Sequence, residues 1–512
     1  MQAIIERLLQ PKAWPTIMWA VVMAGLTFLL HLLTTRPSLS HAVPKLWKPD
    51  DLPILGAWRF YSHRQEMYYD AQTSTDTGNF SFFIGKKHVV GVSGPEGRKT
   101  FFDTKDLVLH DGFSALFAGF PEQSAGDGEN FNRFFKMCLN SLFKSESLNK
   151  KIDLLANDAQ RMCEALAVAP VSDSHPDWRV MNPFDSMYRL VYQLTTRTIG
   201  ASEIAEDPEL FNRTLSIFEQ FESRTSVLKL FLPWLPTPNF IIRMYSGARL
   251  YKTFLDIIKS REKSGKRVDD AFQHIIDTGA STSDVISFEI ASLFAGLVNS
   301  GIHASYIPLY CADNPEWKAK VQAEVDGVVA KYRSTPDQSP AMVLSSLSVE
   351  QWDNEFPLID LTLRESIRIG QPGCGFRKNN GPRDIPIGST GEVIPRGSYA
   401  AYLFNDVHLD PNIYTDSQKF DPTRYFHDRA EDRKMSHTYV GWGSGRHPCV
   451  GMRFAKLEMV LSSAYFFAMF EFEPSEKDGS LRTEPVPPVD AKLHQVRKPD
   501  DPIFIRYKPR AY

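Results

Sequence analysis

Cysteine is scarce in this chain of 512 residues: there are five, each isolated in the sequence, and no two form a Cys-x-x-Cys pair. An odd number of isolated cysteines argues against a disulfide framework and against a zinc ribbon, and it favours a reducing compartment that faces the cytosol. An excess of positive charge is also missing, because 58 Lys and Arg residues stand against 61 Asp and Glu residues. Nucleic acid is therefore excluded as a principal partner. Internal repeats and low-complexity tracts are absent as well.

What the chain does have is helical periodicity. Apolar side chains recur at helix spacing from about residue 131 to residue 363, and the pattern breaks at loops at residues 166–183, 232–239, 260–267 and 333–343. Short strands are expected at residues 80–84, 88–92 and 502–508, with Pro95 opening a helix after the second strand. The length exceeds the ~250 to 300 residues that one hydrophobic core usually supports. We therefore expect a large body that is mainly α with a smaller β region.

One long apolar run lies near the N-terminus. Residues 14–33 read WPTIMWAVVMAGLTFLLHLL and contain no Asp, Glu, Lys or Arg. About 20 residues at 1.5 Å each match the ~30 Å hydrocarbon core of a bilayer, so the run predicts a membrane span within an anchor of residues 1–36. A proline-rich hinge at residues 37–56 and a main domain at residues 57–512 follow. A cleaved signal peptide is the alternative, although such peptides have shorter apolar cores.

A second apolar stretch lies in the middle of the chain. Residues 228–245 read LKLFLPWLPTPNFIIRMY, and three prolines prevent a single helix. Two interpretations remain open. The stretch is either a buried helix pair joined by a proline turn or a lipid-facing entrance for apolar substrates.

The stretch that carries most chemistry is residues 441–451, GWGSGRHPCVG, which precedes a helix-like segment. Its glycines permit a tight loop beside a flat ligand, and Pro448 stiffens that loop. Cys449 is delivered just ahead of a helix, whose first backbone amides favour an anionic sulfur. A dinucleotide loop of the form Gly-x-Gly-x-x-Gly would need glycine at Arg446, so this class is excluded. A lone cysteine is more commonly a small buried apolar residue.

This loop resembles the haem-binding loop of the cytochrome P450 family, Phe-x-x-Gly-x-Arg-x-Cys-x-Gly, with Trp442 for the Phe and His447 for the Arg. The resemblance spans about residue 50 to the C-terminus and points to the microsomal, eukaryotic or fungal type. It implies the P450 fold preceded by a transmembrane helix, haem b as cofactor, and Cys449 as the axial thiolate that binds the iron. Residues 57–512 would then be the haem-thiolate catalytic domain.

Two further motifs resemble those of the same family. Glu365 and Arg368 in LTLRESIRI share a helix face at i, i+3 spacing, although alone such a pair is usually a solvated surface feature. The segment FDPTR resembles the family segment whose arginine, here Arg424, completes a structural triad with them. The resemblance also suggests Arg377, His447 and Lys136 as partners of the haem propionates.

The central helix departs from the family pattern. Family members commonly carry an acid and a threonine above the haem, whereas residues 295–301 read AGLVNSG, with Val298 and Asn299 in those places. Asn299 can orient water but cannot supply a titrating proton, so Ser300 is predicted to hold the proton-relaying water. Gly296 and Gly301 are expected to leave room for oxygen or substrate.

The resemblance implies a monooxygenase that inserts one oxygen atom from O₂ into a lipophilic terpenoid, steroid or polyketide-like compound of specialised metabolism. The chain lacks a flavin or nicotinamide fingerprint, so electrons are expected from a separate NADPH-cytochrome P450 reductase at the endoplasmic reticulum membrane. Candidate contacts to an acidic reductase surface are Arg453, Lys456 and Lys144. Two other classes remain: a haem-thiolate isomerase, dehydratase or ring-forming oxidase without net oxygen insertion, and a non-catalytic haem-binding sensor.

Overall fold

The computed structural model describes residues 14–117, 128–231, 235–490 and 492–511, and the chain divides into two compact units. The first unit is built from residues up to Ala115 and from Phe376–Tyr402. The second unit holds nearly all the long helices and comprises Leu116–Leu230, Trp234–Gly375 and Leu403–Tyr512. The amino-terminal part of the expected anchor, residues 1–13, lies outside the described residues.

The first unit is organised by a seven-stranded sheet of order β1-β2-β3-β4-β10-β7-β5. Its strands are β1 (Asp51–Leu52), β2 (Gly56–Ala57), β3 (Phe80–Ile84), β4 (Lys87–Gly91), β5 (Leu107–Val108), β7 (Cys374–Asn379) and β10 (Tyr399–Leu403). The predicted hairpin forms from β3 and β4, which pair antiparallel from Phe80 opposite Gly91 to Ile84 opposite Lys87. The next strand, β10, runs parallel to β4. A two-stranded ribbon of β8 (Ile385–Pro386) and β9 (Val393–Ile394) lies in the same unit.

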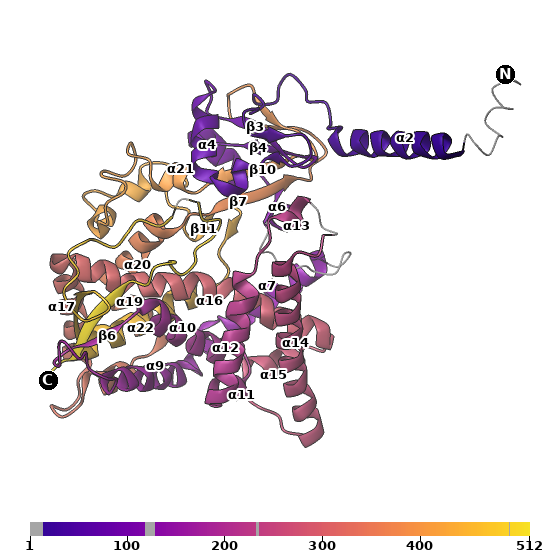
Figure 1. Ribbon diagram of the computed structural model, residues 1–512. Helices are drawn as coiled ribbons and strands as arrows, with labels where there is room; N and C mark the ends of the chain where they lie inside the picture. The colour runs from indigo at the N-terminus through magenta and orange to yellow at the C-terminus, as the bar shows by residue number, and fades with distance from the viewer. Residues whose placement is uncertain (1–13, 118–127, 232–234, 491, 512) are drawn as a thin grey trace, which may run out of the picture. The chain divides into compact units, whose positions relative to one another are not determined.

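Short helices accompany this sheet: α3 (Arg59–Ser62), α4 (Arg64–Thr73), α5 (Gly94–Asp103) and α6 (Leu109–Leu116). As predicted, Pro95 stands in the first turn of α5. The apolar N-terminal run forms the single helix α2 (Trp14–Thr34), drawn in indigo in Figure 1, and its described apolar side chains from Met18 to Leu32 are exposed. Exposed apolar side chains on a helix of this length suit a lipid environment.

The second unit is an assembly of helices. They are α7 (Gly128–Leu142), α8 (Ser145–Asn149), α9 (Ile152–Ala167), α10 (Pro183–Ile199), α11 (Ser202–Glu206), α12 (Pro208–Ser223), α13 (Leu228–Phe231), α14 (Pro238–Ser264), α15 (Ala271–Ile276), α16 (Thr282–Asp313), α17 (Pro315–Tyr332), α18 (Pro340–Ser345), α19 (Val349–Asn354), α20 (Pro357–Gly370), α21 (Asn405–His408) and α22 (Met452–Met469), with 3₁₀ turns η2 (Pro422–Tyr425) and η3 (Glu431–Arg433). The fold class, mainly α with a smaller β region, is confirmed.

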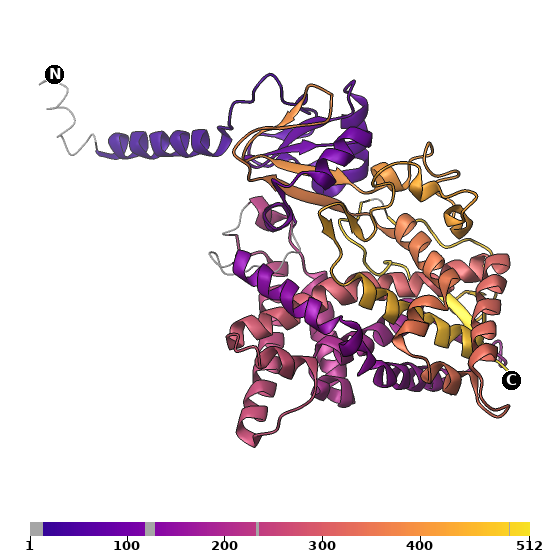
Figure 2. The same ribbon diagram turned by 180° about the vertical axis from the view of Figure 1, so that it is seen from behind.

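The core of this unit is organised around α16, which packs against α10, α14, α20 and α22 (Figures 1 and 2). Within the described residues, α16 is the one helix long and apolar enough to cross a membrane, but most of its apolar window is buried among its neighbours. Burial of that kind identifies α16 as the core helix, while α2 contains a shorter apolar helix, Met18–Leu32.

A three-stranded sheet of order β13-β14-β6 completes the second unit. Its strands are β13 (Phe470–Ser475), β14 (Phe504–Pro509) and β6 (Arg179–Met181). The late strand β14 was expected from the sequence. The short strand β6 lies inside a segment that was predicted as a loop. It was missed because its pairing partner, β14, is more than 300 residues away in the sequence.

Candidate active site

The glycine-rich stretch folds into a tight hairpin of β11 (Gly443–Ser444) and β12 (His447–Pro448). Gly443 and Gly445 adopt φ angles of 69° and 59°, in the left-handed region that glycine tolerates. A Cβ at Gly443 would lie 2.5 Å from the carbonyl oxygen of His447, so no other residue fits there. A hydrogen bond from the Cys449 backbone N–H to the Trp442 carbonyl, at 2.7 Å, closes the hairpin.

This hairpin presents the Cys449 side chain, which is exposed, immediately before α22. Protein atoms around the thiol raise its pKa above the usual value, while the backbone N–H groups of Gly451 and Met452 oppose that rise. Those two amides belong to the start of the helix and stabilise a thiolate. A metal cation at the sulfur would act in the same direction as the amides.

The predicted triad is assembled and completely buried. The Arg368 guanidinium donates to both carboxylate oxygens of Glu365 at 2.8 Å, and Arg424 Nε donates to Glu365 Oε1 at 2.9 Å. All three side chains have 0% exposure. Arg368 also donates to the carbonyls of His408 and Ser417. The triad therefore ties α20 to the segment that leads into the hairpin.

Two members of this network were not predicted. Tyr425 donates its hydroxyl to Glu365 Oε2 at 2.8 Å, and Glu431 accepts from Arg424 Nη1 at 2.7 Å. Glu431 balances the second guanidinium, so two buried carboxylates face two buried guanidiniums. Neither residue belongs to a short motif. Only their proximity to Arg424 in the sequence could have drawn attention to them.

The three predicted propionate partners lie in different settings. Lys136 is exposed on α7 and lines a shallow surface groove with Arg133 and Lys144. His447 is half-buried in β12, one residue from Pro448. Their role toward a cofactor stays a prediction.

Arg377 belongs to the first unit and is buried there. Its guanidinium donates to the carbonyls of Phe101 and Phe102 on α5, and it stacks over the Phe101 ring at 4.6 Å. Burial lowers its pKa to about 10. The Nε atom has no hydrogen-bond partner within the described chain, so it keeps one donor for a ligand.

The central helix separates the two residues that the sequence placed side by side. Asn299 is exposed, with its amide N–H donating to the Ala295 carbonyl at 3.2 Å, whereas Ser300 is buried. The expectation that Gly301 leaves room for oxygen or substrate is wrong, because a Cβ there would lie 2.5 Å from the Tyr188 ring on α10. At Gly296 a Cβ would meet only Thr195, at 3.6 Å, so the expectation for this glycine stays a prediction.

Sequence reasoning also missed the acid that Ser300 faces. Glu458 on α22 is 1% exposed and accepts from the Thr195 hydroxyl at 2.8 Å. Burial raises its pKa to about 8, and the hydroxyls of Thr195 and Ser300 moderate that rise. A buried carboxyl of this kind holds a proton near neutral pH. Its only signal in the sequence is a glutamate on the apolar helix that follows Cys449.

These features fit one kind of cofactor. A single exposed thiol on a loop cleared by glycines, supported by amides of a helix start, suits a flat macrocycle whose iron takes one sulfur from the protein. The exposed residues Ala295 and Asn299, in the middle of the largely buried helix α16, provide an open face in the same unit. The fold and the site together define a haem-thiolate protein.

Comparisons with known proteins agree with this assignment to the haem-thiolate proteins. Residues 47–497 match the family model described as Cytochrome P450. Similar proteins include the cytochrome P450 monooxygenase AacuE of Aspergillus aculeatus, 32% identical with 94% of this chain and 97% of that protein covered. Another is the cytochrome P450 monooxygenase dmxR5 of a Cryptosporiopsis species, 29% identical with 93% and 92% covered. The structure of retinoic acid-bound cyanobacterial CYP120A1 has the same fold, with a TM-score of 0.70, 20% identity, and 92% and 100% coverage.

The chain belongs to the cytochrome P450 family. It is a haem-thiolate monooxygenase with haem b as its cofactor, and this class works with O₂, a small-molecule substrate and a redox partner.

Proposed function

We propose that Cys449 is the axial thiolate of the haem and that the enzyme hydroxylates a lipophilic terpenoid, steroid or polyketide-like compound of specialised metabolism. The observation that carries the proposal is the position of Cys449, exposed at the end of a glycine hairpin with two helix-start amides directed at its sulfur. The fungal monooxygenases among its relatives support the same reaction type. Residues 57–512 form the catalytic domain in this proposal.

The remaining site residues take complementary roles. His447, Lys136 and the free Nε of Arg377 are the proposed partners of the two propionates. Haem with a thiolate ligand supplies the activation of O₂ for insertion of one oxygen atom. Asn299 orients a water through its amide. Ser300 holds the proton-relaying water, and Glu458, whose pKa of about 8 keeps the carboxyl protonated at neutral pH, donates the proton to that water.

Electrons are proposed to come from a separate NADPH-cytochrome P450 reductase at the endoplasmic reticulum, with α2 as the anchor and the catalytic domain in the cytosol. Lys144, exposed beside α7, is the stronger docking candidate. Arg453 and Lys456 are already paired with Asp353 at 2.7 Å and Asp360 at 2.7 Å, so less of their charge is open to a partner.

The ligand assignment is tested by Cys449→His. In the reduced carbon monoxide complex, the absorption band of a thiolate-ligated haem should move to the position of an imidazole-ligated haem. Cys138→Ala, which removes a buried cysteine from α7, is the matched control and should leave the band in place. An unchanged band in Cys449→His would overturn the assignment.

An isomerase, dehydratase or ring-forming oxidase is the second candidate, favoured by Asn299, an amide where the family usually has a threonine. NADPH consumption measured against product separates the two. In a monooxygenase, Asn299→Thr should retain substrate oxidation. Ser300→Ala should divert electrons from NADPH to the reduction of O₂ to hydrogen peroxide. In an enzyme that rearranges a peroxide, Asn299→Ala lowers turnover and NADPH is not required. A fully coupled Ser300→Ala enzyme would contradict the proposed proton path.

A further inference from the structure

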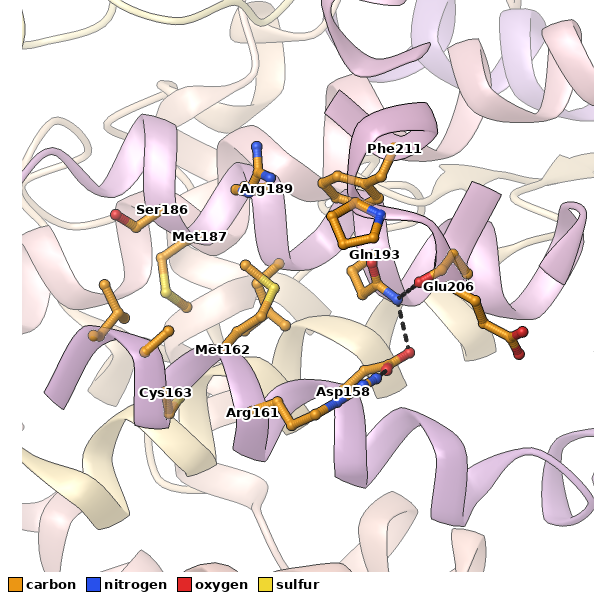
Figure 3. A pocket seen from close by; sticks show the side chains of 15 residues that line it. Asp158, Arg161, Met162, Cys163, Ser186, Met187, Arg189, Gln193, Glu206 and Phe211 are labelled. Carbon is orange, nitrogen blue, oxygen red and sulfur yellow. Dashed lines mark hydrogen bonds and ion pairs between the residues drawn. The ribbon is translucent and has the colours of Figure 1, made fainter. Parts of the chain in front are cut away.

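A groove with a volume of about 430 Å³ lies in the second unit and contains none of the residues assigned above (Figure 3). Two helix faces, one on α9 and one on α10, form its long walls, and the junction of α11 and α12 bounds one end. A volume of this order is typical of sites that hold a small organic molecule.

The walls of the groove are apolar and rich in sulfur. Met162 and Leu166 follow each other by one turn on α9, and Met187 and Leu190 do so on α10. The Phe211 ring from α12 lies toward the end that carries the charged side chains (Figure 3). Thioether sulfurs pack favourably against aromatic rings, so the walls suit a flat aromatic molecule.

The acidic side chains of the groove are neutralised within the protein. The Asp158 carboxylate accepts from Arg197 Nε at 2.9 Å, from Gln193 at 3.0 Å and from Arg161. Glu206 accepts from Arg197 at 3.1 Å. Asp158 is buried and fully paired, so it is not open to an incoming base, and the charge of Glu206 is matched by Arg197.

Arg189 is different, because it is half-buried and has no ion pair among the described residues. Its guanidinium donates to the side-chain oxygen of Asn212, a neutral partner, and stacks over the Phe211 ring at 4.7 Å. Burial lowers its pKa, against the attraction of Glu219. A guanidinium has five N–H donors in a fork that matches a carboxylate, and most of these donors have no carboxylate to meet here.

We propose that this groove is a second ligand site, which binds a small aromatic carboxylate. The carboxylate pairs with Arg189, and the ring lies between Met162 and Met187. The same binding would hold α9, α10 and α12 together.

The test uses the haem-loaded full chain and 2-naphthoate as the probe, with binding followed by calorimetry. We expect saturable binding of 2-naphthoate and much weaker binding of the neutral 2-naphthalenemethanol. Arg189→Gln should weaken 2-naphthoate binding about tenfold or more, because the charge-assisted pair is lost. Arg213→Gln, which removes an exposed arginine from α12, should bind like the wild type.

A pair of filling variants checks the location independently. Ala165→Trp, at the mouth of the groove, should abolish the calorimetric signal, whereas Val168→Trp, 80% exposed and outside the groove, should not. Haem absorbance reports that each variant is folded. Equal affinity of 2-naphthoate for the wild type, Arg189→Gln and Ala165→Trp would place the ligand elsewhere and overturn the proposal, as would equal affinity for the neutral alcohol.

Discussion

Glu365 is the residue on which the buried network depends. It accepts from Arg368, Arg424, Tyr425 and the Asp421 backbone. Glu365→Ala would leave two buried guanidiniums without their shared anion, a loss of about 3 to 5 kcal/mol. We expect little haem incorporation and a lower unfolding temperature, measured as the haem-to-protein ratio and by thermal denaturation.

The control for this prediction is a glutamate in an exposed pair of similar spacing. Glu146 lies 3.6 Å from Lys150 on the surface, and both side chains are largely exposed. Glu146→Ala should change stability little, since exposed pairs contribute little. A Glu365→Ala protein that is fully loaded with haem and melts like the wild type would show that the network is dispensable.

Glu458 predicts a dependence of stability on pH. Its pKa is raised from 4.5 to about 8, so the folded state disfavours the ionised form. Below about pH 4.5 the carboxyl is protonated in both the folded and the unfolded state, so stability is at its highest. As the pH rises to about 8, the carboxyl ionises in the unfolded state alone, and stability is lost progressively. Glu458→Gln removes this loss, which amounts to roughly 1.4 kcal/mol for each unit of pKa shift.

The measurement compares unfolding temperatures of the wild type and Glu458→Gln at pH 5 and at pH 8.5. The variant should gain stability relative to the wild type as the pH rises, and Glu476→Gln, at an exposed glutamate, should not. A difference between Glu458→Gln and the wild type that is the same at both pH values would refute the raised pKa.

For individual residues, the sequence predicts contacts between near neighbours in the chain and misses contacts that only folding creates. The i, i+3 spacing put Glu365 and Arg368 on one helix face, and the resemblance to the P450 family supplied their place in a triad with Arg424. Tyr425 and Glu458 were not, because their partners come from other elements: Tyr425 meets Glu365 on α20, and Glu458 meets Thr195 on α10. No spacing rule links residues 263 positions apart.

Among helices and strands, the same distinction sets the limits of prediction. The hairpin of β3 and β4 was predictable from two short apolar runs separated by a turn at Gly85, whose φ is 59°. The loop expected at residues 260–267 begins later, because α14 continues to Ser264 and ends at Gly265 with φ 63°. The order of the seven-stranded sheet depends on strands far apart in the chain, and local patterns contain no information about it.

The packing of α16 against α10 predicts the effect of Gly301→Ala. The new Cβ would lie 2.5 Å from the Tyr188 ring, and such overpacking costs about 1 to 3 kcal/mol. The gain in helix propensity, about 1 kcal/mol at most, does not offset it. Thermal denaturation should therefore show a lower melting temperature.

Gly327 on α17 is the matched control, because a Cβ there meets nothing within 4 Å. Gly327→Ala should be neutral or slightly stabilising. Adding Tyr188→Leu to Gly301→Ala should recover part of the loss, since the two changes share one contact. If Gly301→Ala melts like Gly327→Ala, the ring does not limit this position.

For the whole molecule, exposed apolar side chains on α2 and α14 support the proposed attachment to a membrane. The helix α2 has exposed apolar side chains throughout its described part. The apolar stretch at residues 228–245 forms two helices, α13 and the start of α14, with Pro233 outside the described residues. Ile241, Met244 and Tyr245 on α14 are 56%, 54% and 64% exposed. Exposure of these side chains favours the lipid-facing interpretation over a buried helix pair.

If both α2 and α14 attach the protein to membranes, deleting residues 1–36 should release it only partly. The apolar side chains of α14 retain interfacial affinity, because each buried apolar group adds to membrane binding even without a span. Adding Ile241→Ser and Met244→Ser to the deletion should release most of the protein, as measured by sedimentation with phospholipid vesicles. The same two substitutions in the full chain should leave it sedimenting, because α2, the proposed anchor, is still present. If the deletion alone gave a protein that is entirely soluble without detergent, α14 would have no part in membrane attachment.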